Sequence, residues 1–210
     1  MPTNKENKDE FVKLLRSTER EGVDDVIAEL EELGFFEAPA SSTQHLNTEG
    51  GLLQHSLNVC YCALKIREQM MQFDESIAKE VPEDRVILAS LLHYVCKSDI
   101  YIRSAVKRKT AIGTWEDTEG YKISYKNFPM GHGEKSVIML MGMGLAMYDD
   151  EMLAIRWHMG AWDLPMHSYE TVKNIDTARK LYPLCVIIQC ADTLAAGVLE
   201  RKTASLLEYK

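Results

Sequence analysis

The chain has 210 residues, of which 46% are hydrophobic and 27% are charged, enough for one folded domain with a substantial core. Its net charge of −8 argues against general nucleic-acid binding, which needs a positive surface to neutralise phosphates. The polar N-terminus resembles neither a secretory signal nor a transit peptide, and no apolar run reaches the roughly 20 residues of a membrane span, so we expect a soluble, cytoplasmic protein.

Helical periodicity dominates the first half of the chain. Helices are expected over residues 9–16, 23–33, 52–71 and 82–95, with a loop over 35–51 between the second and the third. Gly34 follows the second apolar stripe as a helix stop, and the Gly50–Gly51 pair marks the loop. Pro82 stands at a first-turn position, where proline favours helix initiation.

Residues 106–128 break the helical pattern. Tyr121, Ile123 and Tyr125 alternate with polar residues, which is the period of a half-buried strand. A turn over 117–120 would let residues 111–115 pair with this strand as a β-hairpin. Helices are expected to resume over 134–145, 150–158, 168–181 and 184–200. The sequence thus predicts a single all-α domain over residues 1–210, with N-terminal helices of 1–34 packed on it and a small hairpin inserted at about 106–128.

Two polar residues stand in strongly apolar surroundings. His93 follows a run of leucines and alanines, and Asp192 lies between isoleucines on one side and Leu194 on the other. Burying an ionised carboxylate costs several kcal/mol unless a cation or hydrogen-bond donors meet it. Asp192 therefore predicts either a partner within the fold or a functional role.

Further histidines occur on other predicted helices or at their ends. They are His55 after the Gly50–Gly51 pair, His132 between two glycines, and His158 at a helix end. Imidazoles and one carboxylate from separate helices of a bundle are suitable ligands for a transition metal. The five cysteines form no CxxC pair, which disfavours a zinc–thiolate site and favours reduced, buried thiols.

The order of these residues resembles the extended motif of the HD-domain metal-dependent phosphohydrolase superfamily. The matching segments are Gly50–Ser56, Leu91–Lys97, Gly131–Ser136, Ile155–Gly160 and Cys190–Asp192. The resemblance extends over about residues 35–199 and implies an HD-domain-like helical bundle. The chain departs from the family at Tyr94, where the family has the aspartate of its His-Asp doublet.

The resemblance implies one or two divalent transition-metal ions: iron, manganese, cobalt, nickel or zinc. By that resemblance, one ion would be held by His55, His93 and Asp192, and a second by His132 and His158. His45 and His167 match no ligand position. The missing aspartate is a metal ligand in the family, so Tyr94 should weaken the binding of an ion.

Three basic residues near the motif are the expected catalytic side chains, because cationic donors bind phosphate oxygens strongly. They are Lys97, one turn after His93, Lys135, next to Glu134 at a helix N-terminus, and Arg156, two residues before His158. A surface charge that contacts only solvent is the plainer interpretation of each. Local lysines and bound ions would reverse the negative net charge inside such a site.

Three functions follow from these features. The first is a hydrolase that uses a metal-activated water to cleave a nucleotide or another small phosphoester. The second is a degenerate domain that binds a nucleotide or a protein partner without turnover, because Tyr94 replaces a ligand. The third is a di-iron oxygenase of HD-like fold, since a phenolate suits ferric iron. A homodimer is the default arrangement for a small enzyme of this type.

Overall fold

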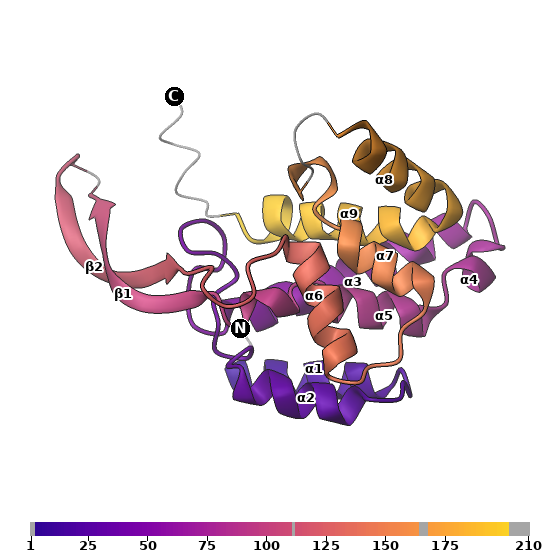
Figure 1. Cartoon of the computed structure of the whole chain (residues 1–210), viewed down its shortest axis with the longest axis horizontal. Helices are drawn as coiled ribbons and strands as arrows, with labels where there is room; N and C mark the ends of the chain where they lie inside the picture. The colour runs from indigo at the N-terminus through magenta and orange to yellow at the C-terminus, as the bar shows by residue number, and fades with distance from the viewer. Residues whose placement is uncertain (1–2, 111, 164–167, 202–210) are drawn as a thin grey trace.

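The computed structural model describes residues 3–110, 112–163 and 168–201. Figure 1 shows a bundle of helices from which one β-hairpin projects. The helices are α1 (Asn4–Arg16), α2 (Val23–Glu32), α3 (Gly51–Met71), α4 (Ile77–Glu80), α5 (Glu83–Leu92), α6 (His132–Gly142), α7 (Asp149–Trp157), α8 (Tyr169–Leu181) and α9 (Pro183–Leu194). Three shorter helical segments are η1 (Val95–Lys97), η2 (Gly160–Asp163) and the π-helical η3 (Ala195–Leu199). The predominance of helix with one hairpin agrees with the sequence-based expectation.

The N-terminal helices pack against the rest of the bundle through aromatic residues. Phe11 of α1 contacts Phe35 and Phe36 of the following loop, with ring centroids 5.4 to 5.6 Å apart, and all three side chains are fully buried. Helix α1 also contacts α3 and α5. It begins five residues earlier than expected, because Thr3 and Glu6 form a capping box at its N-terminus.

Helix α5 ends at Leu92, three residues earlier than expected. His93 is the C-cap residue, and Tyr94 leaves the helical conformation with φ −112° before the short η1 segment begins. The apolar run continues to Val95, so hydrophobicity alone did not mark this end. The motif around His93 therefore lies at a helix terminus rather than inside a helix.

Four helices bring the predicted site residues together. Helix α3 packs against α5 and α9, and α7 packs against α5, α6 and α9. His55 is on α3, His93 and His158 follow α5 and α7, and Asp192 is on α9. The packing of these helices places the motif residues at one end of the bundle, where α6 also begins.

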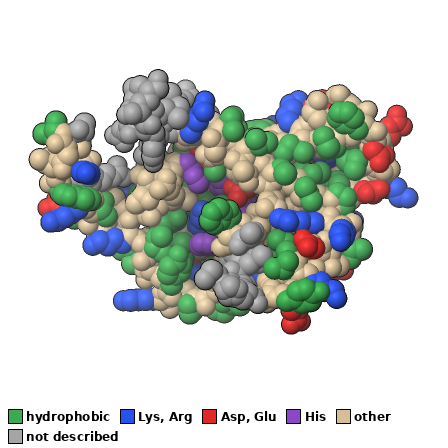
Figure 2. Space-filling view, turned by 90° about the horizontal axis from the view of Figure 1, so that it is seen from above, with side chains coloured by type: hydrophobic (Ala, Val, Ile, Leu, Met, Phe, Trp, Pro, Cys, Tyr) green, Lys and Arg blue, Asp and Glu red, His purple; other side chains and the backbone are tan. Residues whose placement is uncertain are grey.

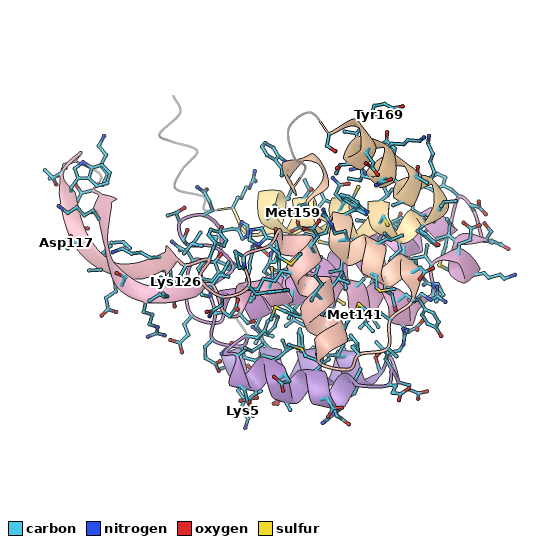
Figure 3. The ribbon with its side chains drawn as sticks, viewed as in Figure 1. Lys5, Asp117, Lys126, Met141, Met159 and Tyr169 are labelled. Atoms are coloured by element: carbon cyan, nitrogen blue, oxygen red, sulfur yellow. The ribbon has the colours of Figure 1, made fainter. Side chains whose placement is uncertain are left out.

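The hairpin exists, but its strands and its turn differ from the expectation. Strand β1 (Tyr101–Lys109) pairs antiparallel with β2 (Trp115–Ile123), and the connection spans 110–114 rather than 117–120. Thr110 Oγ1 contacts Thr114 Oγ1 at 2.8 Å, and the backbone N–H of Thr110 donates to the Thr114 carbonyl. Figure 3 shows Asp117 near the outer end of the hairpin and Lys126 near its base.

The sequence predicted no membrane-spanning helix and predicted reduced, buried cysteines. Within residues 3–110, 112–163 and 168–201, no single helix has the length and hydropathy needed to cross a bilayer; only α8 together with 183–199, bent by 104°, passes on length and composition. The five cysteines are unpaired by disulfides. Three of them are buried, Cys62 is half-buried and Cys190 is exposed, so the expected burial holds for most of them.

Candidate active site

His55 lies on the first turns of α3 and is fully buried. Its Nε2 is 3.2 Å from Asp192 Oδ1 and 3.3 Å from His93 Nε2. Its Nδ1 lies 3.0 Å from Glu200 Oε2. Both nitrogens of this one ring are therefore engaged, with a carboxylate at each side.

His93 and His158 are built in the same way at the ends of two helices. Each is the C-cap residue of its helix, and its Nδ1 donates to the carbonyl three residues earlier, Ser90 or Ile155, at 2.6 Å. A helix leaves its last carbonyls without intrahelical donors, so these hydrogen bonds satisfy the terminus. Because a carbonyl only accepts, the neutral rings carry the proton on Nδ1 and present the lone pair of Nε2 to the interior.

Three ligand atoms converge between α3, the end of α5 and α9. The ligand atoms of His55, His93 and Asp192 all lie within 4.8 Å of one another, although Asp192 Oδ1 is 4.0 Å from His93 Nε2. His158 adds a buried Nε2 with no hydrogen-bond partner among the described residues. Imidazole nitrogens and carboxylate oxygens are ligands for zinc and for the other first-row metals, and an unpartnered buried nitrogen is costly without such a cation. The residues present therefore fit a divalent transition metal.

The pKa shifts describe how this cluster is balanced without a metal. Burial lowers the pKa of His158 to about 4, and burial with the neighbouring His158 lowers the pKa of His93 well below its usual value. Burial opposes protonation of His55 too, but hydrogen bonds from its ring to Asp192 and Glu200 outweigh that cost and raise its pKa. The two carboxylates therefore favour protonation of His55, whereas burial disfavours protonation of His93 and His158.

Tyr94 fills the space beside this cluster with an aromatic ring. Its ring centroid is 4.4 Å from that of His93 and 4.5 Å from that of His158. The centroid of the His132 ring lies 6.0 Å away, and the two rings are perpendicular. The hydroxyl donates to Met159 Sδ at 2.7 Å, at the end of the bundle where α6 begins (Figure 3). An aromatic ring therefore packs beside both His93 and His158, whose own rings contact each other with centroids 4.9 Å apart.

His132 occupies the first position of α6, away from the three converging atoms. Its Nδ1 lies 3.5 Å from Cys96 Sγ. The described residues contain two groups of at least three ligand atoms within 4.8 Å, and neither includes His132 or His158. The structure thus brings three of the five expected metal ligands within reach of one ion.

Lys97 is buried close to the histidines. Its ammonium donates to the Ala40 carbonyl at 2.9 Å and lies 3.3 Å from the centroid of the Tyr94 ring. Burial lowers its pKa to about 8, with Asp192 opposing the shift. Of the three expected phosphate-binding side chains, Lys97 is the one in direct contact with the residue next to His93.

Lys135 and Arg156 already have acidic partners. Lys135 is 3% exposed, and its ammonium donates to Asp99 Oδ1 at 2.6 Å and to the Asn127 carbonyl at 3.1 Å. Arg156 donates to Glu134 at 2.6 Å and stacks on the ring of Trp157. Binding of a phosphate by either residue would therefore compete with an existing ion pair.

Two residues near the cluster had no place in the expected site. Glu200, directly after η3, accepts hydrogen bonds from His55 and from Asn58 Nδ2. His45, in the loop before α3, stacks on the His55 ring at 5.1 Å, and its Nε2 is 3.7 Å from Glu200 Oε2. The spacing of eight residues between Asp192 and Glu200, about two helical turns, is a signal that could have identified Glu200. His167 lies outside the described residues.

Figure 2 shows where this end of the bundle reaches the surface. Histidine side chains are visible in the middle of the face seen from above, with acidic and basic side chains beside them. A groove of about 710 Å³ lies elsewhere, between the hairpin and the loop residues 47–49, and is lined by no histidine. Because the two groups of converging ligand atoms found among the described residues both lie in the histidine cluster, we assign the candidate site to that cluster.

Comparison with known proteins gives a partial similarity. A segment of 67 residues, 32% of this chain, is 40% identical to the dihydroneopterin 2',3'-cyclic phosphate phosphodiesterase of Methanocaldococcus jannaschii. The chain spans about a quarter of that relative's length, since the match covers 26% of it. No family model matches the chain, and no solved structure matches it.

Proposed function

We propose that the chain is a metal-dependent phosphohydrolase that acts on a nucleotide or another small phosphoester. The observation that carries this proposal is the convergence of His55, His93 and Asp192, whose ligand atoms lie within 4.8 Å of one another in a buried position. The local similarity to a protein named as a phosphodiesterase supports phosphoester hydrolysis as the reaction class. That name also makes a cyclic phosphodiester a sensible first substrate to test.

The contacts of the site residues indicate which would bind the metal and which would bind the phosphate. His55, His93 and Asp192 would hold the ion, which supplies a water activated for attack and polarises a phosphoryl oxygen. The helix-capping hydrogen bond of His93 fixes its ring and keeps Nε2 aimed at the ion. Lys97 would compensate the charge of the phosphate, because it is buried beside the site and its other contacts are to neutral groups.

The direct test is hydrolysis by protein loaded with Mn²⁺ or Co²⁺, with bis(p-nitrophenyl) phosphate and a 2',3'-cyclic nucleotide as substrates. Both should be cleaved, and chelation should stop the reaction. Asp192→Asn should lose activity, whereas the exposed Asp176→Asn on α8 should not. A wild-type protein that binds the ion but cleaves neither these esters nor p-nitrophenyl phosphate would contradict the proposal.

A second candidate function is binding without turnover, and Tyr94 is the observation that favours it. Its ring packs against both His93 and His158, and its hydroxyl donates to Met159. In this case calorimetry would detect nucleotide binding to the wild-type protein, and no product would accumulate. Product formation at a rate proportional to protein concentration would exclude it.

A further inference from the structure

Glu200 is a buried carboxylate that the proposed reaction does not yet use. The residue is 8% exposed, and its side chain is 1% exposed. Its Oε1 accepts a hydrogen bond from Asn58 Nδ2 at 2.8 Å, and its two oxygens lie 3.0 and 3.1 Å from His55 Nδ1. Burying this carboxylate is costly, so these contacts mark a specific arrangement rather than a surface charge.

The local backbone explains how Glu200 reaches His55. Helix α9 continues into the π-helical η3, and Glu200 is its C-cap residue. A single helical run therefore supplies two carboxylates to one ring, Asp192 at 3.2 Å from Nε2 and Glu200 at 3.0 Å from Nδ1. Single π turns are rare and occur often at functional sites.

We propose that Glu200 is a positioning residue that holds the His55 ring with its proton on Nδ1 and its Nε2 directed at the bound cation. This inference rests on the metal site of the proposed function. A carboxylate that accepts from the outer nitrogen of a metal-binding histidine fixes the ring orientation and makes the inner nitrogen a better ligand. Asn58 in turn fixes the carboxylate, because its amide donates to the Oε1 atom.

The neighbouring His45 gives an alternative that the experiment must separate. His45, His55 and Glu200 form the second group of ligand atoms within 4.8 Å, and His45 Nε2 has no hydrogen-bond partner among the described residues. If Glu200 were itself a metal ligand there, its removal would lower the number of ions bound. If Glu200 positions His55, its removal weakens binding without changing that number.

The experiment is a titration of metal-free protein with Co²⁺ alone, in which calorimetry measures the Kd and the number of ions bound. Glu200→Ala should raise the Kd by about 10- to 100-fold with unchanged stoichiometry. Glu200→Gln, which keeps an acceptor oxygen, should have a smaller effect and remains usable if the alanine variant does not fold. Glu32→Gln, at an exposed position on α2, is the matched control and should bind Co²⁺ like the wild type.

NMR of the N–H groups of the histidine rings adds a readout that does not depend on activity. In the Zn²⁺-loaded wild type, His55 should show a downfield Nδ1–H proton, which should move upfield in Glu200→Gln. An unchanged Co²⁺ Kd in Glu200→Ala, or the loss of one bound ion, would overturn the positioning role alone. A wild-type protein that binds no Co²⁺ would overturn the proposed function together with it.

Discussion

Tyr94 places an aromatic ring next to the histidine cluster. Its ring packs against both His93 and His158, and the Lys97 ammonium lies over its face. The hydroxyl donates to the Met159 thioether, so the residue contributes an aromatic ring beside the histidines and no carboxylate oxygen. The rings of His93 and His158 also contact each other directly, with centroids 4.9 Å apart.

Replacing this ring should open the site to further metal. Tyr94→Asp removes the ring and supplies a carboxylate beside His93 and His158, so metal content should rise by about one ion per chain and turnover should increase. Tyr94→Phe keeps the ring and removes only the hydroxyl, so it should leave the metal content unchanged. Elemental mass spectrometry of protein purified without chelator measures both. Equal metal content in Tyr94→Asp and the wild type would refute this interpretation.

The buried Lys97 should make stability depend on pH. Its pKa falls from 10.5 to about 8 on folding, so the unfolded chain binds more protons than the folded one between these values. The free energy of unfolding should therefore rise between pH 8 and 10.5, by about 3 kcal/mol at 1.36 kcal/mol per pKa unit. Below pH 8 both states are protonated and this contribution is constant.

Lys97→Met removes the titrating group and should remove this rise. Urea unfolding at pH 7.5 and pH 10 measures the difference between the variant and the wild type. Burial raises the pKa of the Cys60 and Cys96 thiols to about 11 in the wild type, which lowers stability at high pH, and the Lys97 ammonium opposes this shift at Cys96. Parallel pH profiles for the two proteins would show that the Lys97 ammonium is not desolvated.

The sequence identified some residues of the candidate site and not others. Asp192 was identifiable because a carboxylate in an apolar helix needs a partner, and the structure supplies His55. His45 was not identified as part of the site because it lies in a loop, where helical periodicity gives no guidance. Glu200 was missed, although it follows Asp192 by about two helical turns. Tyr94 could be recognised as unusual, but the direction of its hydroxyl depends on Met159, which packing alone brings near.

At the scale of elements, the close approach of α6 and α7 determines where His132 and His158 lie. Gly133, in the first turn of α6, is in contact with the backbone of α7, because a Cβ at this position would lie 2.1 Å from the Arg156 carbonyl oxygen. That distance is too short for any side chain, so a glycine is needed here for α6 to start beside the end of α7.

Two alanine substitutions in α6 should therefore have opposite effects. Gly133→Ala should destabilise the protein by about 1–3 kcal/mol, because it forces the two helices apart. Gly142→Ala should be neutral or stabilising by up to about 1 kcal/mol, since no atom of the described residues lies within 4 Å of its Cβ position and alanine favours helix. Urea unfolding compares the variants. Equal stability of the two would mean that α6 tolerates displacement.

The sequence predicted the hairpin but misplaced its strands and its turn. Residues 117–120 have turn-like composition, yet they lie within β2, where Gly120 pairs with Ser104. A Cβ on Gly120 would lie 2.5 Å from the Val106 side chain, so this glycine makes room for a cross-strand neighbour. Composition cannot distinguish a glycine that forms a turn from one that relieves crowding in a strand.

At the scale of the molecule, the candidate site joins helices that are far apart in sequence. His55, His93 and Asp192 come from α3, the end of α5 and α9, which also contact one another through the core. Periodicity predicted most of the helices, although the short α4 (Ile77–Glu80) was not expected. It did not predict their mutual arrangement, because this depends on packing between surfaces that no local pattern encodes.

A bound ion should therefore stabilise the whole bundle. Co²⁺ at 100 times its Kd should add about 2.7 kcal/mol to the free energy of unfolding and raise Tm by roughly 5–10 °C. Asp192→Asn should abolish this increase, whereas the exposed Asp176→Asn should retain it. Thermal unfolding followed by circular dichroism measures the shift. A Tm that is insensitive to Co²⁺ in the wild type would contradict the proposed site.

The capping role of His93 and His158 has a consequence for how such a chain evolves. Each ring completes a helix end through its Nδ1, so both residues remain under selection for folding even in a lineage that has abandoned catalysis. Asp192 makes no such helix-capping contact, and its carboxylate is partnered by His55 Nε2 at 3.2 Å. A lineage that has lost hydrolytic activity should therefore keep the two histidines longer than it keeps Asp192.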